Sequence, residues 1–563
     1  MEIMQLVDDK IKELNGLYVR MDKTKERLEN PYELKDYDGK TISKAISVTL
    51  NMPRWQANVM ADKLLKLQWQ TVVQSSSKLP KTKISAIEQF SDDVWSQIDE
   101  FLSEQRGLTG GLDTWNAKKV VTRGPIGARW WLYYDKDDNL IIDCQPLDMR
   151  WCPFELNEWY CNITYRDAES LKLEYQDQEG FSVGGLGGND LEVRDCWNGD
   201  KEEIYVAKKK IGEKPNPFKV APFVVVMTSA GFQFRDKGYL EHESESFDWL
   251  DRDLYDEANR SASIAQSLAM DSLLGGFEQE RANPSDPAVK PPAPDESINV
   301  GIGETHHRIE RGDLNNAYMK ASQEITQAIS RGGVTDTEAG NNEQGRTALW
   351  VTTQNALLVE KLKPWQDSLA DFRQKSMRMI IDQYIKLGKI KKSKEIDFGI
   401  RGMKHRYSAE QLGDPSTYRI TYVPMLNSQE QNIANVAIAN AQRGLLPQRF
   451  ILQDTLQVQD PDGMIRELEM EKAKQADPTI GMLDMALSYA EEAQELTGID
   501  ADIKNEMSRI LTENVVVMRR QRRMAMMPQP TPKEEAKPNM QGLMALTGDR
   551  GGVSKVTATT EAK

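Results

Sequence analysis

The 563-residue sequence contains few of the residues that most often carry catalysis or bind metals. It has 4 histidines and 4 cysteines. His306 and His307 are adjacent, and neighbouring residues of a strand point to opposite faces, so we do not expect them to share a metal. The motifs H-E-x-x-H, G-x-S-x-G and G-x-x-x-x-G-K-[ST] do not occur. We therefore expect no enzymatic activity, no cofactor and no metal.

The cysteines and the lengths of the apolar runs indicate the cellular compartment in which the chain is expected. Cys144, Cys152, Cys161 and Cys196 lie close together in sequence without C-x-x-C spacing. This pattern favours buried free thiols, and a zinc site is the weaker alternative. The sequence has no run of 18 apolar residues and no signal-peptide pattern. It therefore predicts a soluble, non-secreted chain with no membrane segment.

The charge of the chain is acidic. The formal net charge is −15 at pH 7, whereas a protein that coats nucleic acid is expected to be basic. An acidic balance is also common among soluble proteins. Charge therefore argues against nucleic-acid coating and does not select a partner.

The N-terminal half predicts helices followed by strands. Helical patterns cover residues 1–28 and 84–106, and residues 42–66 contain another. Pro53 marks the start of that helix, with Trp55, Val59, Ala61 and Leu64 or Leu65 on one face. Residues 118–164 alternate and are rich in β-branched and aromatic residues, and DKDDN at 135–139 predicts an antiparallel hairpin or meander. Further strand patterns cover residues 192–197, 203–210 and 220–228.

The middle of the chain holds the most informative pattern. A helical stripe at 237–274 precedes five prolines between Pro284 and Pro294, which no helix tolerates. A second helix at 314–331 then leads into a polar loop, GGVTDTEAGNNEQGRT. Residues 348–387 follow as one helical pattern of roughly 60 Å, in which Pro364 predicts a kink. The apolar seam of this long helix is Leu358, Leu362, Trp365, Leu369, Phe372 and Met379.

The C-terminal part predicts mainly helix. Residues 389–424 are mixed with a strand at 418–423, residues 429–474 are helical, and residues 477–527 predict two helices. Residues 528–563 have the composition of a disordered tail.

Residues 240–260 form an acidic segment of the first middle helix. Eight acids stand against Arg252 and Arg260, which gives 2 − 8 = −6. The residues of interest are Glu241, Glu245, Asp248, Asp251, Asp253 and Glu257. A solvated acidic face is the favoured interpretation; a wall that keeps a polyanion from sticking and a carboxylate metal site are the alternatives.

Taken in order, these elements resemble the portal proteins of tailed double-stranded DNA bacteriophages. The resemblance covers residues 47–478. It is carried by VTLNMPRWQANVMADKLLKLQWQTVV, VVTRGPIGARWWLYYDKDDNLIIDCQPLDMRW, NPFKVAPFVVV and the NIANVAIANAQRG…DPDG region. The order helix, Pro-rich module, helix, loop and long kinked helix is the most specific part of it.

The resemblance implies an α+β, mainly helical portal-type fold that assembles as a ring, usually a dodecamer. The implied regions are an N-terminal wing at 1–236, stem helix 1 at 237–274, a clip at 275–312, stem helix 2 at 313–331, a tunnel loop at 332–346, a long kinked helix at 347–388, a C-terminal wing at 389–476, crown helices at 477–527 and the tail at 528–563. The ring would sit at the portal vertex of the virion after assembly in the host cytoplasm. Its partners would be double-stranded DNA, the major capsid protein, the terminase and the head-tail adaptor.

Two sets of contact residues follow from the resemblance. The tunnel loop would meet DNA through Thr335, Asp336, Thr337, Asn341, Asn342, Gln344 and Arg346. The clip would meet the motor and the adaptor through Asp286, Lys290, Asp295 and Glu296. Two alternatives stay open: another virion structural protein such as an adaptor or core component, and a metal-dependent phosphohydrolase that uses the acids at 240–260.

Overall fold

The structure is a computed structural model of the chain, and it divides into two compact units, Met1–Arg466 and Glu467–Lys563. The structure describes residues 3–43, 45–75, 79–134, 140–175, 181–182, 187–231, 244–274, 277–280, 283, 302, 305–308, 316–334, 348–391, 395–400, 402–425, 429–456, 458, 461–495 and 499–526.

The chain mixes helix and sheet, as the sequence predicts. The described helices up to the unit boundary are α1 (Ile3–Glu13), α2 (Asn15–Glu29), α3 (Met52–Leu65), α4 (Lys81–Arg106), α5 (Gly111–Thr122), α6 (Ala168–Tyr175), α7 (Arg252–Leu274), α8 (Asn316–Gly332), α9 (Ala348–Lys391), α10 (Ala409–Leu412), α11 (Gln429–Gln442), α12 (Gln448–Phe450) and α13 (Pro461–Ala476). A 3-10 turn at Met149–Trp151 and a π-helical turn at Ile451–Thr455 complete this set.

All described strand pairs are antiparallel. The strands are β1 (Gln68–Gln74), β2 (Ile126–Tyr134), β3 (Leu140–Leu147), β4 (Phe154–Glu155), β5 (Trp159–Arg166), β6 (Leu191–Asn198), β7 (Lys201–Val206), β8 (Lys209–Pro215), β9 (Phe223–Val226), β10 (Phe277–Glu280), β11 (Thr305–Arg308), β12 (Glu395–Ile400), β13 (Met403–Ser408) and β14 (Arg419–Met425). They form the sheets β3-β2-β9, β4-β5-β6-β7-β8, β1-β14, β10-β11 and β12-β13. The pairing of β2 with β3 confirms the predicted hairpin, although residues 135–139 lie outside the described residues.

The long helix α9 is central to the core of the first unit. It packs against β2, β9 and β14, and Phe372 and Tyr384 are buried in one cluster with Trp130 of β2. The Gln383 amide forms strand-like hydrogen bonds with β2, the middle strand of its sheet. Its Nε2 donates to the Trp130 carbonyl at 2.8 Å, and Leu132 N donates to its Oε1 at 3.1 Å. Satisfying these strand groups inside the core fixes the helix on the sheet.

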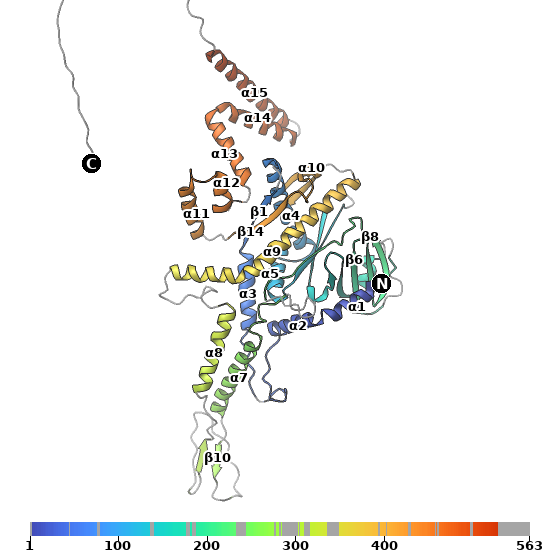
Figure 1. Ribbon diagram of the computed structural model, residues 1–563, viewed down its shortest axis with the longest axis vertical. Coiled ribbons are helices and arrows are strands. Elements are labelled where there is room, and N and C mark those ends of the chain that lie inside the picture. Colours follow the sequence, from blue (N-terminus) through green and yellow to red (C-terminus); the bar gives the residue numbers. More distant parts are fainter. Residues whose placement is uncertain are drawn as a thin grey trace, which may run out of the picture. The chain divides into compact units, whose positions relative to one another are not determined.

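The predicted seam of α9 is confirmed where the structure describes its side chains. Leu362, Leu369 and Phe372 are buried, and Trp365 and Met379 are partly buried against the same core. Pro364 lies inside the helix and has no N–H to donate to the preceding turn. The helix runs over 44 residues and bends along its length (Figure 1), as the sequence predicts.

Three sequence predictions are wrong at element boundaries. Residues 118–122, predicted as strand, end the helix α5, whose buried residues include Asn116, Ala117, Val120 and Val121 at helical spacing. The predicted strand at 203–210 is two strands joined by a two-residue turn. Residues 244–251, predicted as helix, precede the first turn of α7.

The apolar face of α3 differs from the prediction in part. Ala61 and Leu64 are buried, as predicted, but Trp55 and Val59 are only partly buried. Ala57, Met60 and the polar Gln56 are buried in addition. The buried face extends to Gln56, whose Oε1 accepts a hydrogen bond from Tyr255 Oη at 2.6 Å. A pattern that counts only apolar residues does not predict a buried glutamine.

The second unit contains the two helices predicted at 477–527, α14 (Pro478–Glu495) and α15 (Ile499–Met526). They pack as a hairpin, in which Ser508 Oγ donates to the Ala486 carbonyl at 2.7 Å. Arg522 pairs with Asp477 at 2.8 Å. Residues 527–563 lie outside the described residues.

Candidate functional site at the base of a two-helix arm

Helices α7 and α8 form an antiparallel pair that we call the two-helix arm, and strands β10 and β11 lie in the segment that joins them (Figure 1). Tyr318 Oη donates to the Ser261 carbonyl at 2.5 Å. Nearer the body of the unit, Tyr255, Ala258 and Ile329 are buried between the helices. The described residues in the middle of the chain therefore run in the order helix, short strands and helix.

A ladder of three hydrogen bonds fixes α7 to an extended segment before α3. The backbone N–H groups of residues 46, 48 and 50 donate to the side chains of Ser267, Ser263 and Asn259, at 2.9, 2.8 and 2.9 Å. Two residues of extended chain rise about 6.6 Å and four residues of helix about 6.0 Å, so the two repeats stay in register. The ladder gives three backbone donors a partner without a second strand.

Asp248 is the buried acceptor that joins the root of α7 to α2. Its carboxylate accepts from Thr24 Oγ1 at 2.9 Å, from Ser246 Oγ at 2.6 Å and from Arg27 Nη1 at 2.8 Å. The Asp248 side chain is 1% exposed and that of Arg27 is 15% exposed. A buried carboxylate with three donors is satisfied, so Asp248 is a structural anchor.

Asp251 is buried at the first turn of α7 in a different way. Its side chain faces Gly332 at the end of α8, and its Oδ2 has no hydrogen-bonding partner in the structure. Its main-chain carbonyl accepts from the N–H groups of Leu254 and Tyr255, which starts the helix. Burial without a compensating donor raises the pKa of Asp251 to about 6.

The end of α8 is connected to α3 and α9 beside this carboxylate. A Cβ on Gly333 would overlap the Gln56 side-chain amide, and Gln56 Oε1 accepts from Tyr255 Oη at 2.6 Å. Lys361 Nζ of α9 donates to the Gly333 carbonyl at 3.3 Å. Four helices therefore meet where the chain leaves α8 and enters residues 335–347.

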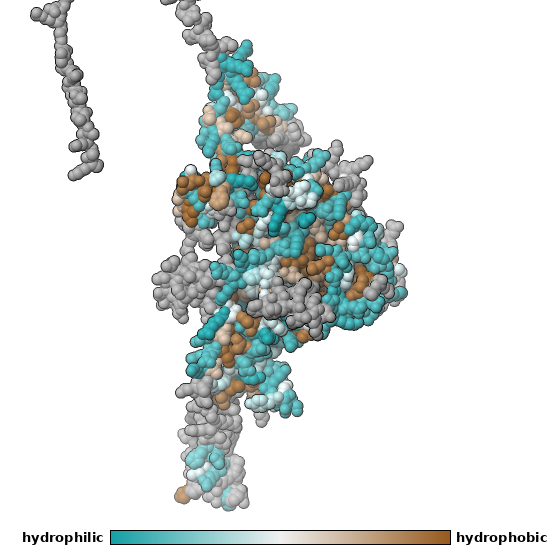
Figure 2. Space-filling view, in the orientation of Figure 1, coloured by the Kyte–Doolittle hydropathy of each residue, from teal (hydrophilic) through white to brown (hydrophobic). Residues whose placement is uncertain are grey.

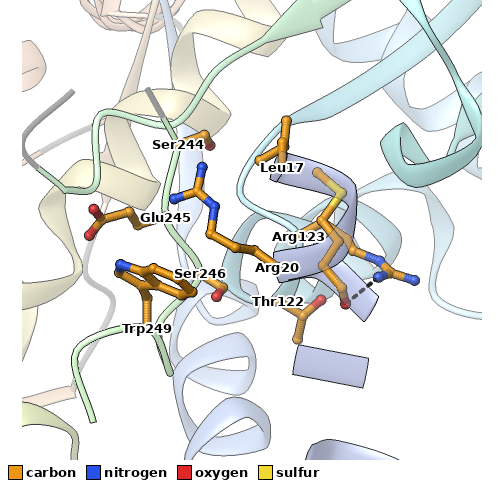
Figure 3. Close-up of a pocket in the computed structure, with 9 residues that line it drawn as sticks. Leu17, Arg20, Thr122, Arg123, Ser244, Glu245, Ser246 and Trp249 are labelled. Atoms are coloured by element: carbon orange, nitrogen blue, oxygen red, sulfur yellow. Dashed lines mark hydrogen bonds between the residues drawn. The ribbon is translucent and has the colours of Figure 1, made fainter. Parts of the chain in front are cut away.

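A small polar hollow lies on the α2 side of the same base. Figure 3 shows Arg20 reaching past Ser246 toward Ser244 and lying beside Trp249. The guanidinium carbons of Arg20 and Arg252 lie 5.0 and 4.3 Å from the centre of the Trp249 ring. The hollow measures about 10 Å³, which is water-sized, so these residues form a packed joint.

The six acids singled out in the sequence do not share one face. Glu241 lies outside the described residues, and Glu245 is partly buried against Gly231. Asp248 and Asp251 are buried, so the expectation of a solvated face is wrong for these two. Asp253 and Glu257 have exposed side chains, at 86% and 46%. The physical reason is that residues 244–251 form the joint of the arm before α7 begins.

The sequence also predicts two other sets of contact residues. Both sets, the loop residues Thr335, Asp336, Thr337, Asn341, Asn342, Gln344 and Arg346 and the clip residues Asp286, Lys290, Asp295 and Glu296, lie outside the described residues. Sequence reasoning also missed Gln56, Asn259, Ser263 and Ser267. The only signal for the last three is their spacing of four along a helix.

No metal centre is apparent in the part of the chain that the structure describes: no group of three His, Cys, Asp or Glu side chains there is arranged to bind an ion. The four cysteines are buried and free, as predicted. Within the same residues, no helix has the length and hydropathy required to cross a membrane.

A larger hollow, of about 650 Å³, lies elsewhere in the first unit between α9 and the chain before and within β9. Phe218, Val220 and Met379 supply apolar walls, and Lys375 and Arg378 are among its charged residues. Of the residues singled out in the sequence, Met379 of the α9 seam lines it, and none of the predicted contact residues does. Its chemistry does not identify an occupant.

No known family profile and no curated protein matches the sequence. Among solved structures, the chain is similar to a chain of the "Neck of native GTA particle computed with C12 symmetry". The TM-score is 0.33 at 9% sequence identity, covering 66% of this chain and 88% of that chain. A likeness at this level carries no argument about function.

Proposed function

We propose that this chain is the portal protein of a tailed double-stranded DNA bacteriophage. Identical subunits, usually twelve, form a ring at one capsid vertex, and DNA is packaged and ejected through its centre. The observation that carries the proposal is the order of elements from α7 to α9. Two antiparallel helices with short strands between them are followed by an intervening segment and a 44-residue helix with an internal proline.

The construction of the arm base supports this role. A conduit subunit has to keep its channel-facing segment in place while DNA moves past it. The chain enters residues 335–347 from Val334, which is 2% exposed, beside the contact between Gly333 and Lys361 of α9. The root of the segment is therefore held by packing and by a contact to the next helix.

The charge of the chain suits a channel that does not grip DNA. Twelve copies carry 12 × −15 = −180 formal charges. The resulting repulsion of phosphate acts over about 8 Å at physiological salt. We assign transient phosphate contacts to the small polar residues of the loop at 332–346, where Arg346 is the cation that approaches DNA.

Exposed apolar residues support an oligomer. Val436, Ile438, Leu445 and Phe450, on α11, α12 and the turn between them, are 51%, 48%, 81% and 45% exposed. Figure 2 shows apolar residues gathered over this segment. Apolar surface of this kind marks contact sites in soluble proteins, and in a ring a neighbouring subunit would cover it.

The proposed ring has defined partners and no catalytic role. We place it at the portal vertex of the virion, against the major capsid protein. The segment at 275–312 would meet the terminase during packaging and the head-tail adaptor afterwards. DNA would be contacted without regard to sequence.

Electron microscopy of the purified full-length chain tests the proposal. We expect closed rings with a central channel. A solid or linear particle would instead favour an adaptor or core component. Binding of Mg²⁺ or Mn²⁺ with phosphatase activity that is lost in Asp251→Asn or Asp253→Asn would favour the phosphohydrolase.

A further inference from the structure

Two of the four cysteines lie directly opposite each other in the five-stranded sheet. Cys161 of β5 pairs with Cys196 of β6 in the antiparallel register. Both side chains are fully buried, and they belong to one apolar cluster with Val7, Trp159 and Tyr205. The cluster packs the sheet against α1, so neither thiol faces water.

The hydrogen bonds identify which kind of cross-strand pair this is. Cys161 N donates to the Pro153 carbonyl at 3.0 Å, on the β4 side of the strand. The N–H and C=O of one strand residue point to the same side, so those of Cys161 point away from β6. Cys161 and Cys196 are therefore a non-hydrogen-bonded pair, in which the Cα atoms are about 4.5 Å apart and the side chains are closest.

This geometry suits a covalent link. A Cα separation of about 4.5 Å lies within the range of protein disulfides, roughly 4.4–6.8 Å. The two Sγ atoms are 2.8 Å apart. The sheet therefore holds the two sulfur atoms within reach of each other without moving the backbone.

Among the described residues, neither a metal site nor another cysteine competes for this pair. Cys152 is also buried near Cys161, but no three ligating side chains are arranged for a metal. Cys144 lies on β3 in a different sheet, opposite Trp130. Cys161 and Cys196 therefore form a two-cysteine site, and the thiols of Cys144 and Cys152 serve as controls in the same chain.

We propose that Cys161 and Cys196 are a modification site: they close into a cross-strand disulfide when the chain meets a disulfide oxidant such as glutathione disulfide. One cysteine thiolate attacks the oxidant, forms a mixed disulfide and releases one glutathione. The second cysteine thiolate then displaces the other glutathione. The protein loses two thiol protons and two electrons and gains one S–S bond, while the oxidant is reduced to two thiols.

The reaction requires opening of the sheet. β5 and β6 are interior strands of the order β4-β5-β6-β7-β8, and burial raises the pKa of the Cys161 thiol well above its usual value. A buried neutral thiol is a poor nucleophile. The link therefore forms during folding or local opening, and a reducing cytoplasm keeps it open.

Mass spectrometry of the full-length chain tests this inference independently of any ring. The reduced chain is unfolded, refolded with excess glutathione disulfide and digested with trypsin without reductant. We expect residues 151–166 linked to residues 195–201, with a mass two hydrogens below the sum. Residues 151–166 contain both Cys152 and Cys161, so a second cut after Glu155 or Glu158 assigns the linked sulfur.

Thiol counting and matched variants complete the experiment. The number of free thiols in the unfolded chain should fall from 4 to 4 − 2 = 2 after oxidation. Cys144→Ser should keep the linked peptide, and Cys196→Ser should abolish it. Four free thiols after refolding with oxidant, a statistical mixture of pairs, or a Cys152 link in place of Cys161 would each overturn the proposal.

Discussion

The carboxylate of Asp251 occupies the space in front of Gly332: a Cβ on this glycine would lie 2.2 Å from Asp251 Oδ2 and 2.4 Å from Oδ1. The first turn of α7 and the last turn of α8 therefore approach each other through a glycine and a buried acid. A larger side chain fits between them only if the Asp251 side chain or one of the helices moves.

The first prediction is that Gly332→Ala destabilises the first unit. The added methyl group overlaps the Asp251 carboxylate, and relief of such overpacking typically costs about 1–3 kcal/mol. Chemical denaturation of both proteins measures the difference. Gly481→Ala is the matched control, because the nearest atom to its added Cβ is Lys474 Cγ at 4.0 Å. The control should be neutral or slightly stabilising.

The second prediction concerns the charge of Asp251. Its folded pKa of about 6 lies above the ordinary 3.8, so the folded state favours the neutral acid. The stabilisation that neutral Asp251 brings is complete below about pH 4 and is lost as the pH rises through about 6. Asp251→Asn should match the wild-type stability in acid and exceed it by about 1–2 kcal/mol at neutral pH, after allowance for screening by nearby solvent.

Unfolding curves across this pH range check that expectation. Asp253→Asn is the control, because that side chain is 86% exposed. A stability difference between Asp251→Asn and wild type that does not change with pH would show that ionisation of Asp251 is not responsible.

The third prediction concerns the pair that joins α2 to the root of α7. Arg27→Met removes the charged donor of Asp248, whose buried carboxylate then keeps only Thr24 and Ser246 as donors. Loss of one partner of a buried pair costs about 3–5 kcal/mol. Lys25→Met, which removes an exposed pair with Glu29 at 3.8 Å, should cost less than about 1 kcal/mol. If Arg27→Met/Asp248→Asn is no more stable than Arg27→Met, the coupling is absent.

The fourth prediction concerns the ladder on α7. Ser263→Ala leaves the N–H of Val48 without its acceptor, which should cost about 1–3 kcal/mol if water cannot replace it. Hydrogen exchange at Val48 should accelerate locally. Thr326→Ala on the exposed side of α8 is the control and should change stability by less than about 0.5 kcal/mol. An unchanged exchange rate at Val48 would show that Ser263 does not protect this N–H group.

The helices with one apolar stripe were the easiest elements to predict. The seam of α9 repeats over many turns, and the structure buries Leu362, Leu369 and Phe372 as the spacing requires. The hairpin of β2 and β3 followed from alternation and a polar break. Both predictions rest on the local spacing of apolar residues along the sequence.

Features that depend on tertiary partners were not predictable in this way. The turn between β7 and β8 uses Ala207 and Lys208 at φ 47° and 67°, where a sequence pattern looks for Asn or Gly. The burial of Asp248 depends on Arg27, which is 221 residues away in sequence. Gln56 turns inward because Tyr255 donates to it. In each case a distant contact outweighs the local preference.

The mass of the assembled particle tests the central claim most directly. Mass photometry of the purified chain, with electron microscopy of the same sample, reports stoichiometry and the presence of a channel together. A portal ring of twelve copies predicts a hollow particle near 12 × 64.0 = 768 kDa. A monomer or dimer at every concentration, or a particle without a central hole, would contradict the account.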